Sequence, residues 1–316
     1  MKTLTLIALS AAALVSLPAS ASQWSDTYLG YRHGDKFQET GCNQDIVKDI
    51  ISLTHTSGYQ YGLNFFNLDV LRSASGVDTS TDNFATSANS KVYDNINGTT
   101  DGTGAQELYL VYFHVLSFGK VTKSNLAFGP VSDIGLETGF DFNSKNTAFA
   151  PKTTKLYAGP QLSFDVTNGY FNLAFMYIKE HNNNSDINSY YDPVHYQVYL
   201  TGRSVDFNGT YRIAAAGSKT FAMGPVESTF KGWVNYTGPK GKDGFGNFTV
   251  AETQGELSWM FDLGKLWGHK GAVYIGPGFA YWNNKFGDRN IDNPSLSPFV
   301  QNRRTTCFEW EAEIHF

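Results

Sequence analysis

The chain has 316 residues, a formal net charge of −5 and only two cysteines. The negative charge argues against a nucleic-acid-binding protein, because such a protein needs clustered Lys and Arg to neutralise phosphates. Two cysteines are too few for a disulfide-framework fold or a four-cysteine zinc site. No Pro-rich linker or shift in composition divides the sequence, so we predict a single domain.

The first residues have the features of a secretory signal peptide. Lys2 precedes an apolar run over residues 4–15, and an A-x-A cleavage signal follows at residues 19–21. About a dozen apolar residues are fewer than the roughly 20 that a membrane-spanning helix needs. We therefore expect residues 1–21 to be removed and residues 22–316 to form the mature domain.

The remaining sequence alternates with period two in segments of about ten residues, which is typical of β-strands. The segment 131–143 shows this best. One face carries Ile134, Leu136, Thr138, Phe140 and Phe142, and the other carries Asp133, Gly135, Glu137, Gly139, Asp141 and Asn143. The same alternation predicts strands at 26–32, 49–56, 59–72, 107–118, 131–143, 155–165, 169–180, 207–221, 227–236, 254–262, 271–283 and 305–316. Twelve is an even number, as closed bacterial barrels usually have.

The connections between these segments alternate in length. Tight turns are predicted at Ser57-Gly58, Thr167-Asn168-Gly169 and Met223-Gly224-Pro225, and long polar links at 73–106, 181–206, 237–253 and 284–304. Membrane barrels have short periplasmic turns and long external loops, and a soluble barrel has no need for that asymmetry. We therefore predict an all-β fold, a twelve-stranded antiparallel transmembrane β-barrel in the cell outer membrane, in contact with its lipids.

The last segment assigns its two faces clearly. Phe308, Trp310, Ile314 and Phe316 alternate with Glu309, Glu311 and Glu313. Three aligned carboxylates cannot face hydrocarbon at tolerable cost, so the aromatic and aliphatic side chains are expected to face lipid and the glutamates the lumen.

Five blocks of the sequence resemble the Tsx-type nucleoside channel family, and most closely its phage-receptor-like branch. They are YQYGLNFFNLD (59–69), GAQELY (104–109), LAFGPV (126–131), GFDFN (139–143) and YWNNKFG (281–287). The resemblance implies a monomeric, narrow barrel that passes nucleosides and can serve as a receptor for bacteriophage. The chain departs from the founding members in its long insert at 73–106 and in lacking their Trp-rich opening strand.

Alternation also predicts which side chains line the lumen. The acidic ones are Glu107, Asp133, Glu137, Asp141, Glu256, Glu309, Glu311 and Glu313, the basic ones Arg32, Lys155, Arg212 and Lys231, and the aromatic ones Tyr109, Tyr157, Tyr274 and Trp282. As the solute site we propose Tyr109, Glu137, Asp141, Tyr157, Arg212, Lys231, Tyr274 and Trp282. Stacking rings beside carboxylates suit a neutral base-plus-ribose solute, and the excess of acidic groups predicts preference for uncharged or cationic solutes.

Alternatives stay open for parts of this site. The charged groups could instead form ion pairs that brace the barrel wall. The rings of Tyr274 and Trp282, which share one strand, are expected to form a ladder along the pore, unless Trp282 is a belt residue at the outer rim. The loop 73–106 reads as a plain surface loop or as a gating or phage-binding loop.

A non-conducting barrel and an outer-membrane enzyme are the two alternatives to a channel. A non-conducting structural or adhesive barrel would have the same sequence pattern. A lipid-modifying outer-membrane enzyme would need a nucleophile and a base. His114 could serve as the base or be an ordinary residue of the aromatic belt, and no GxSxG or HExxH motif is found. The glycine-rich segment 238–244 lacks the spacing of a phosphate loop. We therefore predict no catalytic residues, no metal and no cofactor.

The two cysteines are predicted to form a disulfide. Cys42 follows the first strand at the external rim, and Cys307 begins the last strand at the same rim. The first and last strands of a closed barrel must pair, and the compartment is oxidising. The alternative is two free thiols whose Cα atoms lie more than about 7 Å apart.

Overall fold

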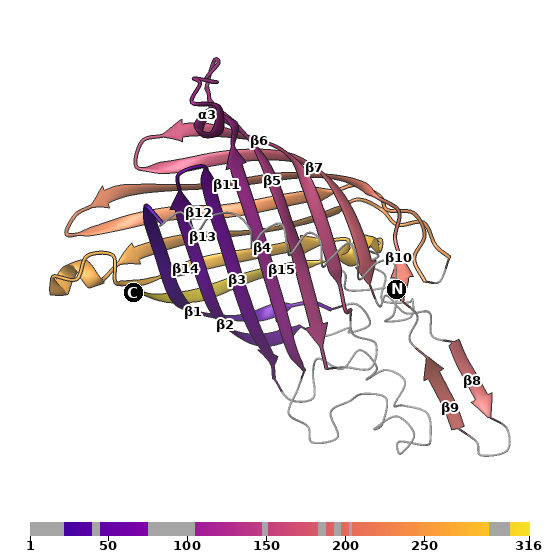
Figure 1. Cartoon of the computed structure of the whole chain (residues 1–316). Helices are drawn as coiled ribbons and strands as arrows, with labels where there is room; N and C mark the ends of the chain where they lie inside the picture. The colour runs from indigo at the N-terminus through magenta and orange to yellow at the C-terminus, as the bar shows by residue number, and fades with distance from the viewer. Residues whose placement is uncertain are drawn as a thin grey trace.

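The computed structural model describes residues 22–39, 45–74, 105–146, 151–182, 188–192, 197–201, 204–244, 246–290 and 304–316. Twelve long strands form the wall of a barrel (Figure 1). They are β1 (Trp24–Phe37), β2 (Ile46–Tyr59), β3 (Gly62–Ser73), β4 (Gln106–Ser117), β5 (Val131–Lys145), β6 (Thr154–Val166), β7 (Gly169–Asn182), β11 (Thr210–Met223), β12 (Val226–Thr237), β13 (Glu252–Asp262), β14 (Val273–Asn283) and β15 (Thr305–His315). The predicted twelve strands are confirmed, with ends that differ by a few residues.

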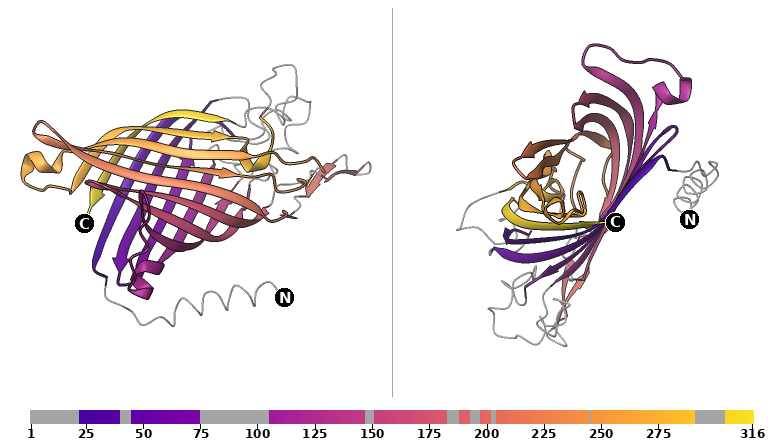
Figure 2. Two further views of the ribbon diagram at one scale, coloured as in Figure 1. Left: turned by 90° about the horizontal axis from the view of Figure 1, so that it is seen from above. Right: turned by 90° about the vertical axis from the view of Figure 1, so that its left-hand side faces the viewer.

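Each of these strands pairs antiparallel with its neighbours, and the sheet closes on itself. The strands pair in the order β7-β11-β12-β13-β14-β15-β1-β2-β3-β4-β5-β6, and β6 also pairs with β7. At the seam between the chain ends, Tyr28 pairs with His315 and Gly34 with Glu309. Figure 2 shows β15 in yellow running beside β1 in indigo. Closure leaves no edge strand unpaired in the wall, so its backbone groups are satisfied within the sheet, as a membrane requires.

Small elements decorate the two rims. β10 (Val205–Asp206) extends the sheet beside β7, and β8 (Asn188–Asp192) pairs with β9 (Gln197–Thr201) in a separate hairpin. The short helices are α3 (Phe118–Thr122), η1 (Gly264–Trp267) and η2 (Lys285–Gly287). Within the described residues, no helix has both the length and the apolar character to cross a membrane.

The connections define a periplasmic and an external rim. Two-residue turns follow β2, β6 and β11 at the rim where β1 begins and β15 ends, and the links that carry α3 and η1 lie at this rim too. The links after β3, β7, β12 and β14, at the opposite rim, are longer. Short turns mark the periplasmic side of such barrels. One predicted turn is wrong: the chain reverses at Gln60 and Tyr61, and Gly58 remains paired in β2. A Cβ on Gly58 would lie 2.1 Å from Nε1 of Trp24, so this glycine makes room for a ring and not for a turn.

The outer face of the barrel is an apolar belt. Large side chains exposed on this face come from all parts of the wall: Leu29, Ile51, Leu53, Val70, Phe140, Phe142, Leu156, Phe175, Ile213, Phe230, Val234, Leu257, Trp259, Ile275, Phe308, Trp310 and Ile314. Soluble monomers rarely expose a continuous apolar surface of more than a few hundred Å². This belt therefore faces lipid.

The last strand shows the predicted division of its faces. Phe308 and Trp310 are 75% and 69% exposed, whereas Glu309 and Glu311 are 3% and 6% exposed. The carboxylates point into the barrel, and the predicted assignment of this strand is confirmed.

A charge placed on the belt should destabilise the barrel according to its depth. Leu257 lies on the outer face in the middle of β13, and Thr253 lies on the same face near the external end. We expect Leu257→Arg to lower the free energy of unfolding by about 2–4 kcal/mol and Thr253→Arg by about 0–1 kcal/mol. Urea titration of the protein folded in lipid vesicles measures both. Equal costs at the two positions would contradict the placement of the membrane.

Candidate functional site in the barrel interior

The interior holds four groups of charged and aromatic side chains: one near the middle of the wall, one in its external half and one at each rim. The first, which we call the central arginine cluster, consists of Arg32, Asp69, Glu256, Glu309 and Glu311. Arg32 donates to Asp69 at 2.5 Å and to Glu256 at 2.7 Å. Because these partners belong to β1, β3 and β13, the guanidinium ties together strands that are not neighbours in the sheet.

The second group, the tyrosine–arginine cluster, contains five of the predicted solute-site residues. The Nη1 of Arg212 lies 3.5 Å from Oδ2 of Asp141, and the hydroxyl of Tyr109 donates to the same oxygen at 3.4 Å. The guanidinium of Arg212 also lies 5.0 Å from the ring centre of Tyr157. Glu137, on the same inward face of β5 as Asp141, is close enough for both charges to act on it. The structure thus places five predicted residues side by side.

At the periplasmic rim, Lys231 and Tyr274 belong to a separate group. The Nζ of Lys231 contacts the two carboxylate oxygens of Glu313 at 2.6 and 2.8 Å. The ring of Tyr274 packs against His315, with ring centres 5.0 Å apart, and His315 in turn contacts Asp26 at 2.8 Å. These contacts bridge β12, β14, β15 and β1.

Trp282 lies at the other end of β14, at the external rim. Its indole N–H donates to Glu252 at 2.6 Å, and the ammonium of Lys285 lies 4.7 Å from a ring centre of the indole. The side chain therefore faces inward and is not a belt residue. The expected ladder with Tyr274 is wrong, because the inward positions between the two rings are Gly276, Gly278 and Ala280.

The fourth group, which we call the external lysine cluster, was missed by the sequence analysis. Glu39 lies among three lysines: Lys48 at 2.5 Å, Lys285 at 3.5 Å and Lys145 at 3.9 Å. Lys48 also lies 3.5 Å from Glu107. Lys48 and Lys145 lie just beyond the predicted ends of β2 and β5, in phase with their inward faces, and that phase is the signal that would have found them.

Charge in this external lysine cluster is closely balanced. Burial by itself would raise the pKa of Glu39, but Lys145, Lys285 and Lys48 hold it well below its usual value. Burial lowers the pKa of Lys285 from its usual value, an effect that Glu39 opposes. The mixed lining that alternation predicted therefore includes further cations at the external rim. Its acidic excess lies toward the centre, on β15.

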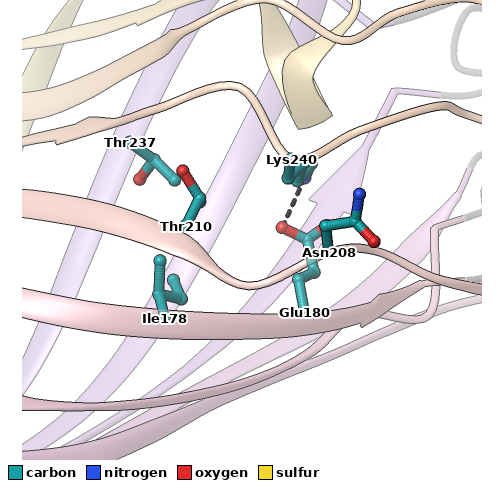
Figure 3. A pocket seen from close by; sticks show the side chains of 6 residues that line it. All are labelled: Ile178, Glu180, Asn208, Thr210, Thr237 and Lys240. Carbon is teal, nitrogen blue, oxygen red and sulfur yellow. Dashed lines mark hydrogen bonds and ion pairs between the residues drawn. The ribbon is translucent and has the colours of Figure 1, made fainter.

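A small recess opens beside this cluster. It has about 150 Å³ of empty space and is lined by Ile178, Glu180, Asn208, Thr210, Thr237 and Lys240 (Figure 3). The ammonium of Lys240 contacts Glu180 and lies 4.4 Å from the ring centre of Phe207.

The remaining predicted residues are the cysteines and His114. Cys307 is fully buried and faces inward, and its Sγ accepts a hydrogen bond from the backbone N–H of Lys36 at 3.3 Å. Cys42 lies outside the described residues, so the disulfide stays a prediction. His114 faces outward and contacts the hydroxyl of Tyr59 at 2.6 Å. In the described part of the chain, no three His, Cys, Asp or Glu side chains are grouped so that they could hold a metal ion.

The closed sheet and its apolar belt define the chain as an outer-membrane β-barrel. No protein-family model and no curated protein matches its sequence. Among solved structures, it is similar to the translocator domain of the autotransporter NalP from Neisseria meningitidis, with a TM-score of 0.41 and 9% identity over 100% of this chain and 95% of that one. It is also similar to the NanC porin, with a TM-score of 0.40 and 8% identity over 91% and 98%. Outer membrane phospholipase A from Escherichia coli has a TM-score of 0.40 and 10% identity over 95% and 93%.

Proposed function

We propose that the protein is a channel for small solutes across the outer membrane, and that nucleosides are the solute class that fits its interior best. The observation that carries this proposal is the tyrosine–arginine cluster, in which two rings, a carboxylate and a guanidinium meet on the inward faces of β4, β5, β6 and β11.

The chemistry of this cluster matches the two parts of a nucleoside. A base offers a flat face for stacking on Tyr109 or Tyr157, and each such contact contributes about 1–3 kcal/mol. The ribose hydroxyls can donate to Asp141 or Glu137, and the guanidinium of Arg212 can donate to a base carbonyl. Contacts of this strength bind a solute without trapping it.

The similarity of five sequence blocks to the Tsx-type family supports the same solute class. It is also the ground for proposing that the protein is a monomer and that a bacteriophage uses its external loops as a receptor. These two proposals rest on the resemblance alone.

A second candidate is a non-conducting barrel, and the ion pairs across the lumen favour it. Arg32–Glu256 joins β1 to β13, and Arg212–Asp141 joins β11 to β5. Such pairs are mostly buried and could brace the wall at the expense of an open path.

Single-channel recording separates the two candidates. The refolded protein in planar bilayers is expected to show openings that adenosine reduces saturably, and Tyr157→Ala should raise the adenosine concentration for half-block by about 5- to 150-fold. Tyr211→Ala is the matched control, because Tyr211 lies on the outer face of β11 and is half exposed.

The absence of openings would favour the braced barrel. If Tyr157→Ala and Tyr211→Ala changed the adenosine concentration for half-block equally, the tyrosine–arginine cluster would not be the solute site. Faster uptake of adenosine monophosphate than of adenosine into liposomes would contradict a preference for neutral solutes.

A further inference from the structure

The three inward carboxylates of β15 differ in their partners. Glu313 is contacted by Lys231 at 2.6 Å and by His315 at 3.4 Å, and Glu311 accepts a hydrogen bond from Ser258 at 2.9 Å. Glu309 is only 3% exposed, yet neither of its oxygens receives a hydrogen bond from any described residue. Buried polar atoms are nearly always paired, so Glu309 is the exception that needs an explanation.

The charges around Glu309 do not supply the missing partner. The groups that act on it electrostatically are Arg32, Glu256, Glu311 and Asp69. The short contacts of Arg32 go to Asp69 and Glu256 and not to Glu309. One guanidinium is thus shared by four carboxylates, and a buried charge without compensation is costly. Among the described residues, the central arginine cluster therefore holds more carboxylates than cations.

The neighbouring strands leave space for these carboxylates. Glu309 pairs with Gly34 of β1 on one side and with Gly278 of β14 on the other. A Cβ on Gly278 would lie 1.7 Å from Oε1 of Glu311, and one on Gly34 would lie 3.2 Å from Cγ of Glu309. A side chain at Gly278 would therefore displace Glu311, and one at Gly34 would collide first with Cys307 at 2.6 Å and Phe37 at 2.9 Å and would also crowd Glu309. Gly278 thus makes room for Glu311 in the central arginine cluster, and Gly34 leaves space beside Glu309 that it shares with Cys307 and Phe37.

We propose that Glu309, Glu311 and Glu256 bind the ammonium group of a small amine. An ammonium group donates three hydrogen bonds to separate acceptors, at about 2.7–3.2 Å, whereas metal ions hold their oxygen ligands at about 2.0–2.6 Å. The side chain of Glu256 is 32% exposed, which gives the group a path from the lumen. Small amines would thus be a second class of solute that binds in the lumen, besides nucleosides. An amine can occupy this site whether or not the barrel conducts.

The test uses the full barrel folded in detergent, with methylammonium as the probe and tetramethylammonium as the control. The two ions carry the same charge, but tetramethylammonium has no N–H to donate. At constant ionic strength, methylammonium chloride is expected to raise the midpoint of thermal unfolding by about 2–4 °C more than tetramethylammonium chloride. If the two salts shifted the midpoint of thermal unfolding of the wild-type protein equally, or if neither shifted it, the proposal would be overturned.

Two isosteric substitutions locate the site. Glu309→Gln is expected to abolish the difference between the two salts, whereas Glu313→Gln, in the same column but already paired with Lys231, should keep it. A difference that persists in Glu309→Gln would overturn the assignment. Thermal unfolding reports binding and not conduction. A barrel that shows no openings in bilayers would therefore contradict the channel proposal but not the proposal of an amine site.

Discussion

Arg32→Met is expected to lower the free energy of unfolding by about 3–5 kcal/mol, the usual cost of removing one partner from a buried ion pair. The substitution removes the only guanidinium of the central arginine cluster, whose short contacts at 2.5 and 2.7 Å go to Asp69 and Glu256. The carboxylates would then repel one another in a buried site. Urea titration of the protein in lipid vesicles, followed by tryptophan fluorescence, measures the change.

Arg72→Met provides the matched control for this prediction. Arg72 lies on β3 near the external rim, and its side chain is exposed on the outer face. An exposed charge of this kind contributes at most about 1 kcal/mol. A loss of similar size in the two variants would show that the central arginine cluster does not hold the wall together.

Glu39→Gln is the second substitution with a large expected effect. It removes the negative charge that lies between Lys48, Lys145 and Lys285 at the external mouth. Three ammonium groups would then repel one another in a buried site, and we expect the free energy of unfolding at pH 7 to fall by about 3–5 kcal/mol. Glu227→Gln, which removes a half-buried partner of Lys265 and of the exposed Lys270 at the periplasmic rim, should change it little.

The contribution of Glu39 should also depend on pH in a defined direction. The pKa of Glu39 is well below its usual value of 4.5 in the folded protein, because the effect of the three lysines outweighs that of burial. A carboxylate with a lowered folded-state pKa stabilises the protein fully above its unfolded pKa and loses this contribution as the pH falls through the folded pKa. The difference between wild type and Glu39→Gln should therefore stay constant at neutral pH and shrink below about pH 4.5. A difference that grows in acid would contradict the assignment.

The wall of the barrel could be predicted because the alternation of polar and apolar residues within each strand shows which face meets lipid. In β15, three glutamates alternate with Phe308, Trp310 and Ile314, and only one of the two faces can meet lipid. The same reasoning placed Asp141, Arg212 and Tyr157 inside. Alternation fixes the face of a side chain without any knowledge of the neighbouring strands.

Positions along the barrel axis could not be predicted in the same way. The proposed ladder of Tyr274 and Trp282 has two glycines and an alanine between its rings, and a correct assignment of face does not reveal what stands between two residues. The turn at Ser57-Gly58 was misplaced because glycine in a strand can make room for a neighbouring ring as well as for a turn.

The contacts within the site depended on closure of the sheet and on the loops. Asp69 and Arg32 belong to strands separated by β2, and alternation says nothing about which inward residues meet across the lumen. Glu39 and Lys285 lie in links between strands, where no period applies. Phase alone could have placed Lys48 and Lys145 on the inward face, but their contacts with Glu39 and Lys285 could not be predicted before the strands and their links were placed together.

The seam between β1 and β15 also sets the order in which the chain can assemble. The contact of His315 with Asp26 joins residues 289 apart, and that of Cys307 with Lys36 residues 271 apart. Bringing such distant segments together costs about 5 kcal/mol of loop-closure entropy, which is recovered only when the strands pair. Until the final strand has been delivered, β1 and β14 are both open edges that invite pairing with other chains. Closure of the wall therefore requires β15, the last eleven residues of strand.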